Sequence, residues 1–398
     1  MKRYAIILSA ALAGACLGCE KVDHSGDNGP VTSGVDLREV AKMLSSLPLA
    51  SEQMGEVFDA VSSSTDNGYD EEYMMKDLFI DPGAGVGDAL SKAAGLSTKA
   101  PKTYSRPLKD LIAEYLAATS TKASDISPEQ YIRTLAESSV QIYWPYSEKW
   151  DGKSWPVITY DPLDGASSNE GFALAELPDG SFRVDRVTVD EEMARTTPVW
   201  VVNVNDDSAY TSLEMRRRLD PDWGRGSGGI SIDSKAADQP LRTLMLKDFE
   251  ATRNYDPWFS GASEFFVKAG AVEDFFASTE AEMQLYSPSI TDFMVVVKRS
   301  ETGTVRPFNA VLVSNWTDQL DAIALMVTED DGGTVTSWKC SAELKIKSKT
   351  YGIDISLPFN SRDDIVWRGQ LSAKYFQAYS GETGRFGDVN LTFELVEK

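Results

Sequence analysis

The second half of the chain is a succession of short strand-forming runs, and this feature limits the folds that the chain can adopt. Nine runs rich in β-branched and aromatic residues succeed one another: 244–251, 264–269, 293–299, 309–315, 322–328, 336–346, 353–359, 365–375 and 389–396. Turn residues separate them, and no long helical pattern intervenes. Many short strands of this kind favour antiparallel pairing in two packed sheets. We therefore predict an antiparallel β-sandwich over residues 247–398.

Residues 36–140 have a helical period instead. Apolar residues recur three and four positions apart, so that each group lies on one face of a helix. The clearest groups are Leu37, Val40, Ala41 and Leu44; Met54, Val57, Phe58 and Val61; and Leu108, Leu111, Ile112, Tyr115 and Leu116. Ser127, Pro128 and Gln130 have the order of a helix start. We predict a helical module whose apolar stripes pack on one another or on the strands C-terminal to them.

Between these parts, residues 141–246 have a period near two and frequent proline and glycine turns. We predict an irregular, β-rich middle domain here. The fold class that results is a multidomain α+β protein: an N-terminal helical module, a β-rich middle and a C-terminal β-sandwich.

The N-terminus, MKRYAIILSAALAGACLGC, has two cations, a short apolar run and small residues before Cys19. This order predicts a cleaved signal peptide over 1–18, since the run is shorter than a membrane span. The ending LGC resembles the lipobox of bacterial lipoproteins, which implies that Cys19 is acylated and anchors the protein to the outer membrane of the cell envelope. Cys16 is the alternative anchor, and an ordinary signal peptide is the alternative interpretation.

Residues 19–35 are polar and contain several glycines, which is typical of a flexible tether. Glu20 and Asp23 resemble the acidic stretch that comes after the lipid cysteine in surface-exported lipoproteins of Bacteroidota. That resemblance implies a surface-exposed protein, and a periplasmic location is the alternative.

The composition excludes several functions. A formal net charge of −22 repels phosphate backbones, so we expect no nucleic-acid partner. The only histidine, His24, lies in the expected tether, so the folded part has no histidine for a catalytic triad, a histidine-rich zinc site or a histidine general base. With Cys16 in the signal peptide and Cys19 assigned as the acylated anchor, Cys340 is left without a disulfide partner, and its alternating context predicts a buried apolar role.

Three stretches of the C-terminal part resemble C2 domains: GASEFFVKAG (261–270), RPFNAVLVSNW (306–316) and ALMVTEDDGG (324–333). The resemblance implies a C2-like sandwich with calcium ligands at Asp256, Glu264, Glu329 and Asp331. Acidic residues on neighbouring loops suit calcium, which takes six to eight oxygen ligands. Glu264 stands where C2 domains usually have aspartate. The alternative is that these acids are simply solvated. The segment PWFSGASE also resembles uncharacterised envelope proteins of Gram-negative bacteria, for which no activity is implied.

The aromatic residues of the middle domain admit two interpretations. Trp144, Trp150 and Trp155 could stack on sugar rings, or they could fill the seam between the helical and β-rich parts. A glycan hydrolase needs paired carboxylates, for which Asp161, Asp164, Asp220 and Asp222 are equal candidates.

The leading functional hypothesis is a non-catalytic binding or adhesion module that calcium supports and that recognises a glycan or a surface protein. A carboxylate-based glycan hydrolase and a structural envelope-assembly lipoprotein are the two alternatives.

Overall fold

The structure, a computed structural model, describes residues 34–79, 104–119, 127–178, 182–205, 210–219 and 241–397. The expected signal peptide, Cys16, Cys19 and nearly all of the expected tether lie outside these residues, as do Asp220 and Asp222. Within the described ranges, no helix has both the length and the apolar character needed to cross a membrane.

The expected N-terminal helices are present. They are α1 (Leu37–Ser45), α2 (Ser51–Asp66), α3 (Met75–Leu78), α5 (Leu108–Thr119) and α6 (Pro128–Glu137). Side-chain caps begin two of them: the Asp36 carboxylate accepts from the backbone N–H groups of Arg38 and Glu39, and the Ser127 hydroxyl accepts from that of Gln130. These bonds satisfy amide groups that have no partner within the helix.

A six-stranded sheet packs with these helices. Its strands are β1 (Glu72–Met74), β2 (Val140–Tyr143), β3 (Val157–Tyr160), β4 (Ser168–Glu176), β5 (Phe182–Asp190) and β6 (Val199–Val204), in the order β1-β2-β6-β3-β4-β5. The sheet is mixed, because β3 pairs in parallel with β6 while the other neighbours are antiparallel. β1 lies inside the segment expected to be helical. The expectation of helix alone is wrong there, because a three-residue strand shows no period in the sequence.

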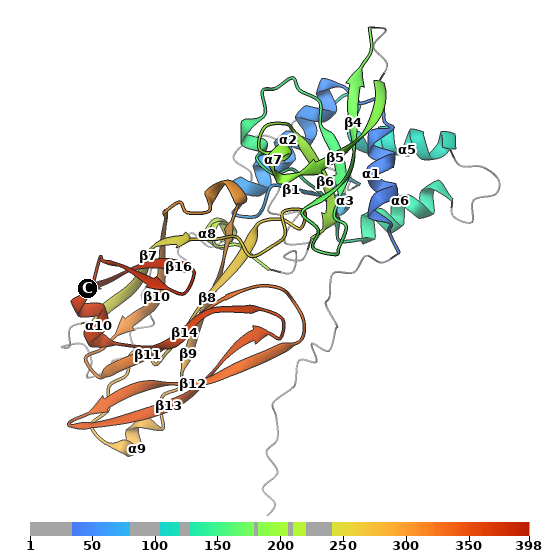
Figure 1. Ribbon diagram of the computed structural model, residues 1–398. Helices are drawn as coiled ribbons and strands as arrows, with labels where there is room; N and C mark the ends of the chain where they lie inside the picture. Colours follow the sequence, from blue (N-terminus) through green and yellow to red (C-terminus); the bar gives the residue numbers. More distant parts are fainter. Residues whose placement is uncertain are drawn as a thin grey trace, which may run out of the picture.

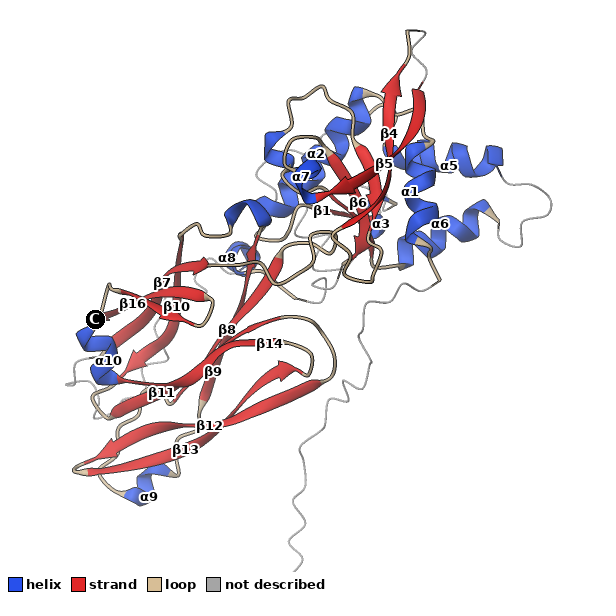
Figure 2. Ribbon diagram, viewed as in Figure 1, coloured by secondary structure: helices blue, strands red, loops and turns tan. Residues whose placement is uncertain are grey.

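The helices do not form a core of their own. Val40 of α1 and Val57 of α2 share one buried cluster with Ile142 of β2 and with Trp200 and Val202 of β6. Alternate residues of a strand face opposite sides of a sheet, so Val199 and Val201 belong to a second cluster on the other face. The helical segment and the β-rich segment thus build one layered unit, here called the N-terminal unit (residues 34–205; Figures 1 and 2).

The C-terminal unit (residues 241–397) is β-rich, and strands occur in all nine predicted runs. They are β7 (Arg242–Ala251), β8 (Ser263–Ala271), β9 (Ser289–Val297), β10 (Arg306–Trp316), β11 (Leu320–Glu329), β12 (Val335–Ile346), β13 (Lys349–Asn360), β14 (Asp364–Ser372) and β16 (Val389–Glu397). β15 (Thr383–Phe386) was not expected from the sequence, and residues 373–375, which were expected to be strand, begin α10 (Ala373–Ala378). The expected boundary at 246/247 falls within β7.

These strands form two antiparallel sheets. One has the order β10-β7-β16-β15, and the other has the order β13-β12-β11-β8-β9, with β14 also paired to β11. Phe249 and Phe393 of the first sheet share a core with Phe265, Phe293 and Leu325 of the second. The arrangement is compatible with the predicted sandwich.

Short helices connect the remaining parts: η1 (Ser147–Lys149), α7 (Glu191–Ala194), α8 (Leu213–Leu219), α9 (Glu280–Met283) and η3 (Arg299–Glu301). α8 lies between the two units in Figure 1. Arg218 of α8 donates to the backbone oxygen of Asp66 at 2.7 Å, and Arg216 donates to that of Asp292 at 2.9 Å. α8 therefore contacts both units.

Candidate metal centre

Strand register gathers acidic side chains at one end of the C-terminal unit. Glu264 is the second residue of β8, and Glu329 ends β11. The two strands are antiparallel, with Glu329 opposite Phe265 and the Asp330 N–H donating to the Glu264 carbonyl oxygen at 3.0 Å. β14 pairs with the other edge of β11 and places Asp364 opposite Glu329. The starts of β8 and β14 therefore both lie beside the end of β11.

The predicted ligands form two groups that share one residue. Asp256, Glu264 and Glu329 each offer a carboxylate oxygen, and these oxygens lie within 4.8 Å of one another. Glu329, Asp331 and Asp364 meet the same limit. We call these five residues the acidic cluster. It contains all four residues expected from the resemblance, and its geometry could hold a metal ion. Asp364 was missed, because only its pairing with β11 brings it near.

Glu329 is the centre of the cluster and has an exposed fraction of 0%. Among the described residues, neither of its carboxylate oxygens accepts a hydrogen bond from a donor, and Asp256 Oδ2 is also without one. Burial of an ionised carboxylate without a compensating charge or hydrogen bond lowers the folding stability by several kcal/mol. Asp256 and Glu329 lie close enough for a hydrogen bond, but two ionised carboxylates have no proton to share. The pair therefore needs either a bound proton or a cation.

The electrostatics agree with this requirement. Burial raises the pKa of Glu329 far above its ordinary value, and the neighbouring carboxylates of Asp256, Asp331 and Asp364 raise it further. Burial also raises the pKa of Asp256, against the opposing effect of the Arg299 guanidinium. The pKa of Asp331 is raised by burial and by the charge of Asp364. Each shift indicates that negative charge in the cluster is poorly compensated by the protein itself.

We expect the unfolding free energy in a chelator to fall as the pH rises from about 5 to about 8. Burial raises the pKa of Glu71 and of Asp363 to about 8, and that of Asp256 to about 6. A carboxyl with a raised folded-state pKa binds its proton more tightly in the folded protein than in the unfolded chain. Its stabilisation of the folded protein is complete below its unfolded pKa and is lost as the pH rises through its folded pKa. Urea unfolding in EGTA at pH 5, 6, 7 and 8 measures this. Stability that instead increases over this range contradicts it.

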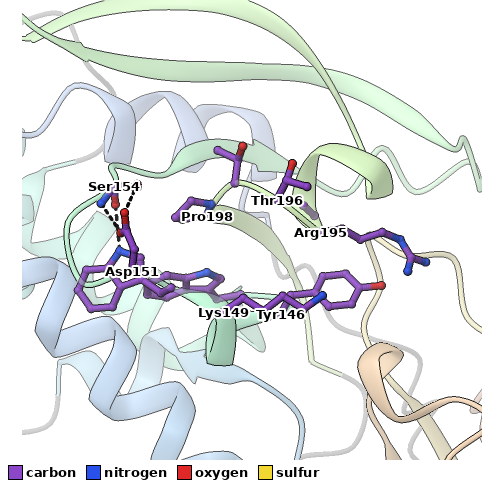
Figure 3. Close-up of a pocket in the computed structure, with 11 residues that line it drawn as sticks. Tyr146, Lys149, Asp151, Ser154, Arg195, Thr196 and Pro198 are labelled. Carbon is purple, nitrogen blue, oxygen red and sulfur yellow. Dashed lines mark hydrogen bonds between the residues drawn. The ribbon is translucent and has the colours of Figure 1, made fainter.

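Of the three tryptophans expected to bind a ligand, Trp144 is buried, and Trp150 and Trp155 are half-buried. Trp144 has an exposed fraction of 1%, and its ring centroid lies 5.4 Å from that of Trp150 and 5.9 Å from that of Trp200. Trp144 and Trp150 line a cavity of about 100 Å³ with Arg195, shown in Figure 3. Small-ligand sites usually have about 300–1,000 Å³. Trp155 is not part of this cavity lining, although it packs at the edge of the same apolar cluster, and its Nε1 donates to Glu176 at 3.4 Å.

A larger hollow of about 540 Å³ lies between α1, α5, α6 and the β4–β5 hairpin. Its lining includes Tyr115 and Tyr131. Tyr115 was expected to pack between helices, and Tyr131 was not singled out from the sequence. The polar groups that α1 contributes are already paired, since Lys42 contacts Glu39 at 2.5 Å. The acidic cluster differs, because the buried oxygens of Glu329 lack donors among the described residues. We therefore take the acidic cluster as the candidate site.

The described hydrolase candidates have structural partners. Asp161 accepts from the Leu163 N–H at 2.7 Å and from the Ser260 hydroxyl at 3.1 Å. Asp164 is exposed and accepts from the Ala166 N–H at 2.9 Å. Both carboxylates stabilise turns.

No protein-family model matches the chain, and no curated protein sequence matches it.

Proposed function

We propose that the acidic cluster is a calcium site. The observation that carries the proposal is the fully buried Glu329 carboxylate, whose oxygens lack donors among the described residues while four more acids surround it. Carboxylates are hard oxygen ligands that suit calcium and magnesium, whereas zinc prefers nitrogen and sulfur. Calcium accepts six to eight ligands in adaptable geometry, but magnesium demands near-octahedral geometry and retains several waters. Five clustered carboxylates therefore favour calcium.

The ligands come from three connections at one end of the unit. Asp256 lies in the β7–β8 connection and Glu264 at the start of β8. Glu329 ends β11 and Asp331 lies in the β11–β12 connection, while Asp364 begins β14 directly after the β13–β14 connection. This grouping of acids at three connections and the adjoining strand ends, together with two packed antiparallel sheets, supports our proposal that the C-terminal unit is a C2-like sandwich.

Calorimetric titration with calcium tests the site. We expect binding by the parent protein, loss of that binding in Glu329→Gln, and retention in Glu343→Gln, an acid on β12 outside the cluster. Magnesium at the same concentration separates calcium preference from general cation binding. The absence of heat and of stabilisation with calcium in the parent contradicts the proposal.

For the whole protein, we propose a lipid-anchored, non-catalytic binding or adhesion module of the cell envelope, with a glycan or surface protein as its ligand. Support comes from the lipobox-like N-terminus, from the lack of histidine in the described residues, and from a calcium-compatible site on the C-terminal unit. The glycan hydrolase predicts sugar release from envelope polysaccharides. The assembly lipoprotein predicts co-purification of one envelope partner in mild detergent.

We expect the Cys19→Ala variant to lose both labelled palmitate and its membrane partition, because the thiol is the expected acylation point. Cys16→Ala is the matched control and should retain both. A Cys19→Ala protein that still incorporates palmitate refutes Cys19 as the anchor.

A further inference from the structure

The β7–β8 connection belongs at once to the acidic cluster and to the contact between the two units. Asp256 supplies a carboxylate to the cluster. Two residues later, Trp258 and Phe259 are buried among residues of the N-terminal unit, in one apolar cluster with Tyr143 and Val201. We call this contact the unit interface. It covers the face of the N-terminal sheet that lies opposite the helices.

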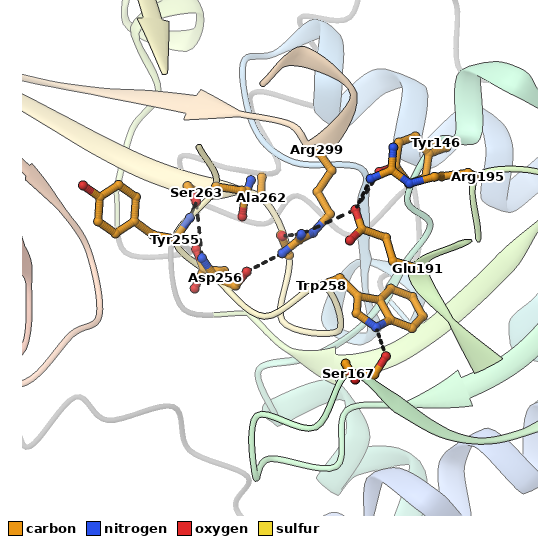
Figure 4. A network of polar contacts seen from close by, with 12 residues as sticks. Tyr146, Ser167, Glu191, Arg195, Tyr255, Asp256, Trp258, Ala262, Ser263 and Arg299 are labelled. Carbon is orange, nitrogen blue, oxygen red and sulfur yellow. Dashed lines mark hydrogen bonds and ion pairs between the residues drawn. The ribbon is translucent and has the colours of Figure 1, made fainter. Parts of the chain in front are cut away.

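Hydrogen bonds fix the connection against the N-terminal unit. Trp258 Nε1 donates to the Ser167 carbonyl oxygen at 3.0 Å, as Figure 4 shows. The amide of Asn203 donates to the Phe259 carbonyl oxygen at 3.0 Å. These bonds, with the burial of two aromatic rings, leave little freedom in the position of the connection.

The other end of the connection is fixed as well. The Ala262 N–H donates to the buried Asp70 carboxylate at 2.9 Å, immediately before β8 begins. Asp70 belongs to the N-terminal unit, so the connection is bonded across the unit interface at this end too. The Asp256 carboxylate, in the same connection, joins the acidic cluster instead.

Arg299 links the β7–β8 connection to the N-terminal unit through polar contacts. Its guanidinium, which is 8% exposed, donates to the carbonyl oxygen of Asp256 and to that of Gly261, the latter at 3.2 Å. It also lies 3.6 Å from the Glu191 carboxylate of the N-terminal unit (Figure 4). The backbone of the metal-ligand residue is thus tied through one cation to the opposite unit.

We propose that cation occupancy of the acidic cluster and closure of the unit interface stabilise each other. This inference rests on the proposed calcium site. A cation held between Asp256 and Glu329 attracts the Asp256 carboxylate and fixes the start of the connection; without it, no donor among the described residues ties the buried oxygens of Glu329 in place. Both interface aromatics lie between the ligand Asp256 and the anchored Ala262, so the attraction also holds Trp258 and Phe259. Linkage requires the reverse effect, in which a closed interface strengthens cation binding.

The affinity for calcium in the full-length protein tests this coupling. The Trp258→Ala variant removes an interface side chain that is not a ligand, and we expect it to weaken calcium binding by about fivefold or more. Phe376→Ala is the matched control: it removes a buried aromatic residue of the same unit, packed against Trp316 and Phe393, away from the interface. We expect its affinity to stay within about twofold of the parent. Phe259→Leu serves as a milder interface variant if Trp258→Ala does not fold.

Hydrogen exchange gives the reciprocal readout. Calcium should slow exchange at least about twofold in segments 67–72 and 143–147 of the N-terminal unit, and should not do so in Glu329→Gln. Calcium binding by the parent with unchanged affinity in both interface variants, or with unchanged exchange, overturns the coupling and leaves the site intact. No calcium binding by the parent overturns both the site and the coupling.

Discussion

Glu329→Gln is expected to have opposite effects in the two metal states. In EGTA at pH 8 we expect the variant to be more stable than the parent by about 1–3 kcal/mol, because the folded parent must either bury the Glu329 charge or hold a proton there far above the unfolded pKa of the carboxyl, whereas the amide is neutral and can donate to Asp256. In excess calcium we expect the order to reverse. Calcium at a hundred times its dissociation constant stabilises a folded protein that binds it by about 2.7 kcal/mol, and the variant lacks this gain.

Thermal unfolding in EGTA and in millimolar calcium measures both effects, since a stabilisation of this size shifts the midpoint by several degrees. Glu343→Gln is the control and should behave as the parent in both states. Equal midpoint shifts for the parent and Glu329→Gln exclude Glu329 as a ligand. A Glu329→Gln protein that is less stable than the parent in EGTA contradicts the proposed charge imbalance.

Trp144→Ala is expected to reduce the unfolding free energy by about 3–5 kcal/mol, the range for large-to-small changes in a core. The reason is its place in the layer between the helices and the sheet, where its ring centroid lies 5.4 to 6.0 Å from those of Phe58, Trp150 and Trp200. Urea unfolding followed by circular dichroism measures the loss.

Trp155→Ala is the comparison for this experiment. Trp155 is half-buried at the edge of the apolar cluster that contains Trp144, so we expect the unfolding free energy to fall by about 1 kcal/mol or less. A small loss in Trp144→Ala together with abolished glycan binding supports the stacking interpretation of the aromatic segment instead. A large loss supports packing as the reason for these tryptophans.

For most segments, the local pattern of apolar residues was enough to predict whether the segment forms a helix or a strand. Apolar spacing located α1, α2 and α5, and alternating runs located the strands of the C-terminal unit, because each such element buries one face. β1 and β15 were missed because strands of three and four residues are too short for a period to be seen. Their existence depends on the partner strands β2 and β16.

The candidate site was predictable to a lesser degree. Asp256, Glu264, Glu329 and Asp331 were expected from a resemblance between short stretches of sequence. Asp364 was not, because it is distant from Glu329 in the sequence and becomes its neighbour only through the β11–β14 register. No sequence pattern indicated that Glu329 is completely buried.

By itself, the sequence determined the segments that become helix or strand, the acidic character of the chain and the scarcity of histidine. These depend on side-chain periodicity and composition, which are local. The tertiary structure decided that the helices cover one face of the six-stranded sheet, that Trp144 is buried in the core between them, and that the residues of the acidic cluster converge beside the unit interface. Such contacts depend on strand register and layer packing between distant segments, where a shift of one residue turns every side chain to the opposite face.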